Sequence, residues 1–126
     1  MTTRSQSSME KKSIDSPDEV RTFDNGKLEI TTFKDGTTIG RATLNPGWSW
    51  EKCIKPLAKT NSCNAPHTQY FVSGRIKIVM DDGTEEEFGP GDTGVIPPGH
   101  NAWVVGDEPV VAIDFTGFKD YAKKIT

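Results

Sequence analysis

Short apolar runs separated by tight polar turns occupy most of the chain between residues 27 and 115. The runs are too short for helices and are rich in β-branched residues, so each of them predicts a strand. The predicted strands cover Lys27 to Phe33, Thr37 to Leu44, Tyr70 to Ser73, Ile76 to Met80, Thr84 to Phe88, Thr93 to Ile96, Ala102 to Val105 and Val110 to Phe115. No long amphipathic helix interrupts them, so the pattern indicates an all-β fold, an antiparallel sandwich or barrel. Of these we expect the antiparallel jelly-roll β-barrel, whose closure removes the sheet edges.

The two ends of the chain lack this strand pattern. Ser16-Pro17-Asp18-Glu19 has the residue types of a helix start, which predicts a short peripheral helix from Pro17 to Phe23. A second helical turn is predicted from Lys119 to Lys124. The first 15 residues are polar and without periodicity, so they predict a disordered tail. A single domain would then occupy residues 16–126, with its barrel core at about residues 26–115.

Composition and charge narrow the class of partner. The chain has 126 residues and a formal net charge of −3, without a large cluster of lysine or arginine. This charge argues against a nucleic-acid surface or an anionic membrane and favours small-molecule or protein partners. No apolar run reaches the roughly 18 residues of a membrane span, and residues 1–16 lack the apolar core of a signal peptide. The expected location is therefore cytoplasmic.

The most distinctive stretch runs from Gly89 to Pro109, where two Pro-Gly turns bracket a short apolar run. The second of these turns places His100 directly before an apolar, aromatic run. The spacing of Gly91, Pro97 and Gly99 resembles the second motif of the cupin superfamily. That resemblance implies a small β-barrel holding a metal or a small ligand, and a homodimer as the usual assembly. The string PPGHNAWVVGDEP also resembles small cupins found alone or attached to nucleotide-cyclase domains.

The resemblance extends over about residues 40–115, but the usual cupin metal ligands are absent. Counted back from Gly74, the glutamate position of the first motif is His67, and a preceding histidine position falls at Cys63 or Ser62. In the second motif the usual histidine position holds Ala102, two residues after His100. The standard set of three histidines and one glutamate is therefore not available here.

The chain nevertheless has a different set of potential metal ligands. Cys63, His67 and His100 lie within or beside the two motifs, and Cys53 lies ten residues before Cys63. Thiolate and imidazole are ligands that zinc prefers, so we expect a divalent metal, Zn²⁺ rather than iron or nickel. An even separation in an extended segment would put Cys63 and His67 on one face. Cys53 would be a fourth ligand or remain outside. The alternative is that these histidines and cysteines are ordinary structural residues.

Several aromatic and polar residues are candidates for a ligand pocket. Trp48 and Trp50 would share one face of an extended segment, either as core residues or as an aromatic wall for a bound molecule. Trp103 allows the same two interpretations. Gln69 and Tyr70 point to opposite faces of the strand after His67, and either would place a polar group in the cavity.

Two classes of function fit these observations. A metal-dependent enzyme would act on a small molecule in the barrel, with His67 or His100 as a metal ligand or, without metal, as a general base. A ligand-binding or sensor module would hold a structural metal or no metal. Neither motif has an acidic residue at an inward ligand position, so the sequence assigns no catalytic residue and no reaction.

Overall fold

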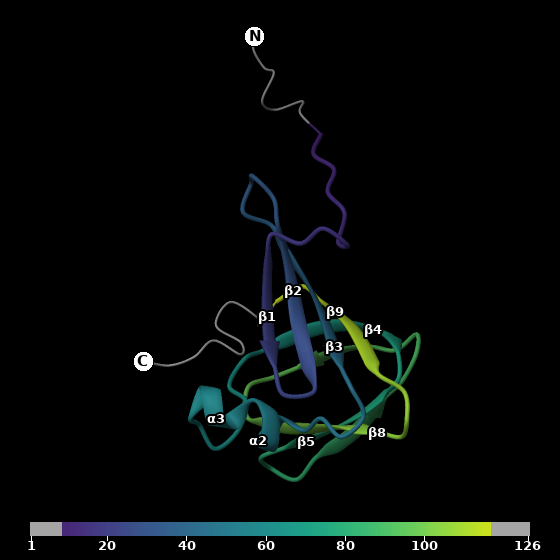
Figure 1. Ribbon diagram of the computed structural model, residues 1–126. Coiled ribbons are helices and arrows are strands. Elements are labelled where there is room, and N and C mark those ends of the chain that lie inside the picture. Colours follow the sequence, from purple (N-terminus) through teal and green to yellow (C-terminus); the bar gives the residue numbers. More distant parts are fainter. Residues whose placement is uncertain (1–8, 117–126) are drawn as a thin grey trace.

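The computed structural model describes residues 9–116, and two antiparallel sheets form most of this part of the chain (Figure 1). The larger sheet has the strand order β1-β2-β3-β9-β4-β7, and the smaller sheet has the order β6-β5-β8. The strands are β1 (Glu19–Phe23), β2 (Gly26–Thr32), β3 (Thr38–Leu44), β4 (His67–Ser73), β5 (Arg75–Met80), β6 (Glu85–Phe88), β7 (Thr93–Ile96), β8 (His100–Val105) and β9 (Val110–Asp114).

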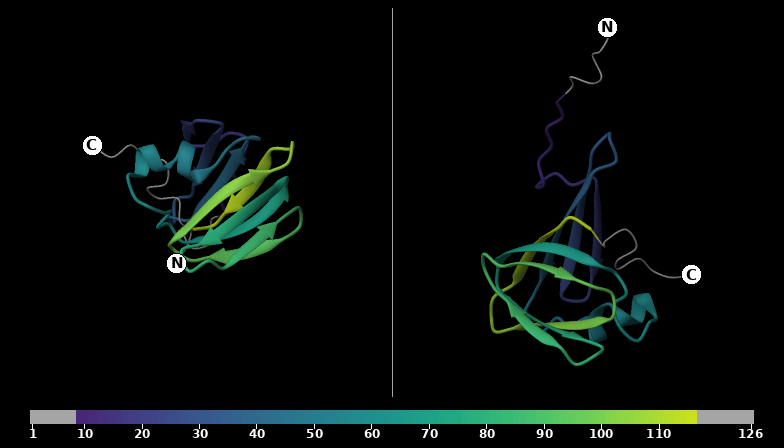
Figure 2. Two further views of the ribbon diagram at one scale, coloured as in Figure 1. Left: turned by 90° about the horizontal axis from the view of Figure 1, so that it is seen from below. Right: turned by 180° about the vertical axis from the view of Figure 1, so that it is seen from behind.

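The two sheets pack face to face with the hydrophobic core between them (Figure 2). Neighbours in each sheet are often distant in sequence, because β9 lies between β3 and β4, and β8 pairs with β5. The expected all-β antiparallel jelly roll is therefore confirmed. The expected full closure is not: among residues 9–116 the sheets stay separate. Three consecutive glutamates on the edge strand β6, Glu85 to Glu87, suit an edge that stays unpaired.

The predicted helix from Pro17 to Phe23 is wrong. Residues 19–23 form β1, which pairs antiparallel with β2 from the Glu19↔Ile30 pair to the Phe23↔Gly26 pair. Asp18, predicted within the first helical turn, instead accepts a hydrogen bond from the backbone N–H of Thr32 at 2.8 Å. Because short acidic side chains accept backbone N–H groups in both settings, the same residue types can begin a helix or flank a strand.

Two one-turn helices stand where the sequence predicts no helix, and the first begins at Trp50, which was expected in an extended segment. They are α2 (Trp50–Cys53) and α3 (Lys55–Ala58), and α2 contacts β8 (Figure 1). Ser49 caps α2, because its hydroxyl accepts a hydrogen bond from the Lys52 N–H at 3.2 Å. The helical turn predicted from Lys119 to Lys124 lies outside the described residues. No helix among residues 9–116 has the length and apolarity needed to cross a membrane.

The described part of the N-terminal segment lies against β2 and β3. Lys12 forms an ion pair with Asp18 at 2.8 Å, and Asp15 forms one with Arg41 at 2.9 Å. Such exposed ion pairs contribute little stability, so the disordered tail at residues 1–15 stays a prediction.

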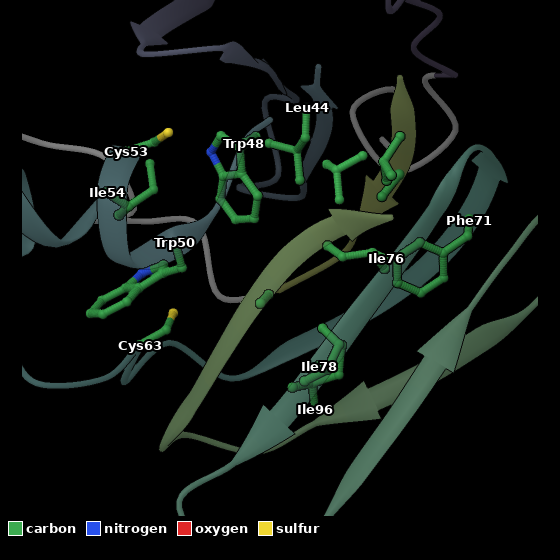
Figure 3. Close-up of a cluster of buried hydrophobic side chains, with 14 residues drawn as sticks. Leu44, Trp48, Trp50, Cys53, Ile54, Cys63, Phe71, Ile76, Ile78 and Ile96 are labelled. Atoms are coloured by element: carbon green, nitrogen blue, oxygen red, sulfur yellow. The ribbon is translucent and has the colours of Figure 1, made fainter. Parts of the chain in front are cut away.

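Buried apolar side chains from both sheets and from α2 fill the space between the layers (Figure 3). Trp48, Trp50 and Phe71 are each no more than 2% exposed. At one end of the sandwich, Gly74 connects β4 to β5 with a φ of +75°. A Cβ atom there would lie 2.4 Å from the carbonyl oxygen of Pro109, so only glycine allows this approach.

Candidate metal centre

Three potential metal ligands from separate parts of the chain meet between the sheets. Cys63, His67 and His100 are buried, and one ligand atom from each lies within 4.8 Å of the other two. His67 begins β4, His100 begins β8, and Cys63 lies in the segment before β4. The structure thus places these three predicted residues in position to hold a metal.

Backbone hydrogen bonds hold Cys63 and His100 together. The Cys63 N–H donates to the His100 carbonyl at 2.7 Å, and the Gly99 N–H donates to the Cys63 carbonyl at 2.7 Å. His67 pairs with Ile96 in the neighbouring strand β7, which leads directly into the turn before His100. The main chain therefore fixes the relative positions of all three residues.

Hydrogen bonds also determine which imidazole nitrogen faces the centre. His67 Nδ1 lies 2.7 Å from Asp114 Oδ2, and His100 Nδ1 lies 2.8 Å from the Pro97 carbonyl oxygen. Both partners can only accept, so both Nδ1 atoms carry a proton and the Nε2 atoms remain for a metal. His67 Nε2 lies 3.8 Å from Cys63 Sγ. The two rings meet edge to face, with their centroids 5.3 Å apart.

The spacing of these donor atoms fits a tetrahedral ion. Zinc binds sulfur at about 2.3 Å and imidazole nitrogen at about 2.0 Å, which places two such ligands roughly 3.5 Å apart at a tetrahedral angle. The sulfur-to-nitrogen distance of 3.8 Å is close to that value. In many metal sites a ligating histidine also donates its other ring N–H to a carboxylate, as His67 does to Asp114. The donor set therefore fits a divalent metal.

The same contacts shift the protonation of the metal-free centre. Burial raises the pKa of the Cys63 thiol, but hydrogen bonds and charges from His100 and His67 outweigh it and lower the pKa to about 6. Burial lowers the pKa of His67, but Asp114 and Cys63 outweigh it and raise the pKa to about 9. At neutral pH the favoured pair is therefore a thiolate and an imidazolium.

Asp114 is the functional residue that the sequence interpretation missed. It is 3% exposed, and its carboxylate accepts hydrogen bonds from His67 Nδ1, from Gln69 Nε2 at 3.1 Å and from the Thr116 N–H at 3.0 Å. The available signal was a lone acid in an apolar strand, in alternation with the inward residues Val110 and Ala112. An acidic residue therefore does stand beside the site, from the last strand rather than from either motif.

A cavity of about 40 Å³ lies between the sheets beside this cluster. Its polar lining consists of Cys63, His67, Gln69, His100 and Asp114. Apolar residues form the rest: Leu28, Ala42, Leu44, Trp48, Trp50, Phe71, Ile76, Ile78, Ile96, Ala102, Val110 and Ala112. Trp48 and Trp50 are thus core residues that also line the cavity, and their role as an aromatic wall for a bound molecule stays a prediction.

The other predicted site residues are not brought into this centre. Tyr70 and Trp103 are 41% and 39% exposed and do not line the cavity, because both point outward from their strands. Cys53 is buried, but it is not part of the cluster of ligand atoms found in residues 9–116. In Figure 3, Trp50 and Ile54 lie between Cys53 and Cys63. The described residues therefore supply three ligands and not the four of a closed site.

Comparison with known proteins identifies the family. Residues 30–121 match the family model of the EutQ-like cupin domain, so the chain belongs to this family. No curated protein sequence matches the chain.

Solved structures support the same fold. The polyketide cyclase RemF from Streptomyces resistomycificus is similar over 94% of this chain and 83% of its own, with a TM-score of 0.60 and 15% identity. A protein of unknown function from Rhizobium leguminosarum covers 86% of this chain and 96% of its own, with a TM-score of 0.58 and 19% identity. Oxalate decarboxylase from Bacillus subtilis covers 79% of this chain, with a TM-score of 0.52 and 24% identity, and this chain spans 27% of its length.

Proposed function

We propose that this cupin domain binds one divalent metal ion through Cys63, His67 and His100, and that a small molecule in the cavity takes a remaining coordination position. The observation that carries this proposal is the buried cluster of three donor atoms within 4.8 Å of one another, beside a cavity. Zn²⁺ is the preferred ion, because zinc favours thiolate and imidazole ligands, whereas harder metals favour oxygen ligands.

Each residue around the centre has a definable role. Asp114 and the Pro97 carbonyl hold the Nδ1 protons of the two histidines, which keeps both Nε2 atoms directed at one point. Trp48 and Trp50 exclude bulk water from the cavity, since both are 2% exposed. A bound divalent ion would supply Lewis-acid chemistry, polarising an oxygen of the small molecule.

The number of protein ligands favours an enzyme. Structural zinc sites are usually closed by four protein ligands, whereas catalytic sites keep one position for water or substrate. The described residues offer three ligands, so the proposed centre has an open position.

A non-catalytic binding module is the second candidate. In the part of the chain that the structure describes, Asp114 is the only carboxylate that lines the cavity, and its oxygens already accept three hydrogen bonds. A site without another acid or base can hold a ligand on the metal without converting it.

The test is metal analysis of protein purified without a chelating tag. We expect about one zinc per chain in the wild type and about one cobalt after exchange, with a thiolate-to-cobalt charge-transfer absorption in the near ultraviolet. Cys63→Ser should lose that absorption, and His100→Ala should lose the metal. Cys53→Ser is the matched control and should keep both. Full metal content in His100→Ala would overturn the proposal.

A further inference from the structure

Resting on this proposed metal centre, we infer that its ligand is a compound of about four non-hydrogen atoms or fewer, carrying no more than one negative charge, which binds the metal through one oxygen. The size of the cavity, the rigidity of its walls and the charge of its lining lead separately to this class.

The cavity is small. A water molecule requires about 10–15 Å³ of such space, so 40 Å³ accommodates roughly three water-sized groups. Pockets for drug-sized ligands occupy roughly 300–1,000 Å³. The space is thus sufficient for a carboxylate with a methyl group and insufficient for an aromatic ring.

The walls of the cavity resist expansion. Phe71 is 1% exposed and stacks on Phe88 with ring centroids 5.0 Å apart. Ile78 and Ile96 lie on strands of opposite sheets and are 6% and 2% exposed. Because a close-packed interior transmits strain instead of yielding locally, a larger ligand would have to separate the two sheets.

The charge of the lining limits the charge of the ligand. Among residues 9–116, no lysine or arginine lines the cavity, and the ionisable groups there are Cys63, Asp114 and the two histidines. A divalent ion bound by the Cys63 thiolate and two neutral imidazoles would keep one net positive charge in its coordination sphere, while the Asp114 carboxylate is already held by three hydrogen-bond donors outside that sphere. A second negative charge on a ligand would then remain uncompensated among apolar side chains, which is costly. Neutral compounds and single anions avoid this cost.

The experiment uses the full chain loaded with cobalt and follows two signals: cobalt absorption and the fluorescence of the tryptophans that line the cavity. Acetate, butyrate, benzoate and malonate are the probes. We expect acetate to change both signals and to bind at least about tenfold more tightly than butyrate or benzoate, since single methylene groups are discriminated by about 10- to 200-fold in fitted pockets. Malonate should not bind.

A variant with a wider cavity separates size from charge. Ile78→Ala removes part of a wall without touching a metal ligand, so it should gain butyrate binding by about tenfold or more while still rejecting malonate. Val95→Ala is the matched control, because Val95 is 76% exposed and outside the cavity. It should bind like the wild type.

The outcomes distinguish this inference from the metal site on which it rests. Failure to load cobalt would contradict the metal site itself. A loaded wild type that binds benzoate as tightly as acetate would overturn the size limit. Malonate binding by Ile78→Ala as tight as butyrate binding would overturn the charge limit.

Discussion

Asp114 Oδ2 lies 2.7 Å from His67 Nδ1, although the two residues are 47 positions apart in sequence. They meet because β9 and β4 are adjacent antiparallel strands, in a register that places Asp114 opposite Gln69, two residues beyond His67. The contact therefore crosses the strand pair diagonally on the inward face. It makes the last strand of the fold a supporting part of the candidate centre.

Asp114→Asn should weaken metal binding while leaving the chain folded. Asparagine keeps the shape of the side chain but removes the charge that favours the Nδ1–H of His67, and loss of such outer partners typically costs about 10- to 100-fold in metal affinity. Competition with a chelator of known affinity measures the change. Asp107→Asn, at an exposed position, is the control and should bind metal like the wild type. Unchanged affinity in Asp114→Asn would show that the contact is only structural.

The metal-free protein should contain a thiolate at neutral pH. In a Cys53→Ser background, the ultraviolet absorption of the Cys63 thiolate should titrate near pH 6 instead of near the ordinary value of 9.0, because His100 and His67 stabilise the anion. Replacing His67 by alanine should move this titration upward. A thiol that titrates at its ordinary pKa in the parent protein would contradict the proposed pair.

The two shifted groups also predict how the metal-free fold responds to pH. Cys63 has a lowered pKa, so its stabilisation is full above about pH 9 and is lost as the pH falls through about 6. His67 has a raised pKa, so its stabilisation is full below about pH 6.5 and is lost as the pH rises through about 9. Thermal denaturation should therefore show the highest melting temperature between about pH 6 and about pH 9. A stability that stays constant from pH 5 to pH 10 would contradict the pairing.

Cys53→Ser should leave metal content unchanged and lower stability. Cys53 is 6% exposed in the apolar core, and a buried hydroxyl without a partner costs about 1–3 kcal/mol. Chemical denaturation measures the cost, and elemental analysis measures the metal. A loss of metal in this variant would restore Cys53 to the site as the fourth ligand suggested by the sequence.

Gly74→Ala should be considerably more destabilising than Gly36→Ala. Both glycines have positive φ values, which cost a non-glycine residue about 1–2 kcal/mol, but a Cβ at Gly36 would meet no atom within 4 Å. At Gly74 the Cβ would overlap the Pro109 backbone, which adds about 1–3 kcal/mol of overpacking. Urea denaturation of the two variants isolates this term. Equal losses would mean that the β4–β5 connection relaxes freely.

The strands were predictable from the sequence because their turns are specified locally. At the β2–β3 hairpin, Asp35 accepts a hydrogen bond from the Thr37 N–H at 2.8 Å, as an Asp-Gly turn suggests. The segment before β2 was not predictable in the same way. Residues 19–23 become a strand only because β2 offers a free edge, and that tertiary pairing overrides a weak local preference for helix.

The candidate site was predictable in its ligands but not in its surroundings. Cys63, His67 and His100 stand out as rare residue types near two motifs, so their grouping follows from the sequence. Asp114 is one of many acids, and its role depends on which strands become neighbours. The outward positions of Tyr70 and Trp103 depend on the strand register, which composition does not determine.

The backbone hydrogen bonds between Cys63 and His100 bear on whether the chain folds before or after it binds the metal. In zinc fingers the ion itself gathers the ligands, so the unloaded chain is unfolded. Here the ladder bonds at Cys63 and Gly99 already join segments 36 or more residues apart through the main chain. Folding would therefore come first and loading second. The ion could then be removed or exchanged in the cell while the chain stays folded. The supply of metal would determine how many sites are occupied, and not whether the chain is folded.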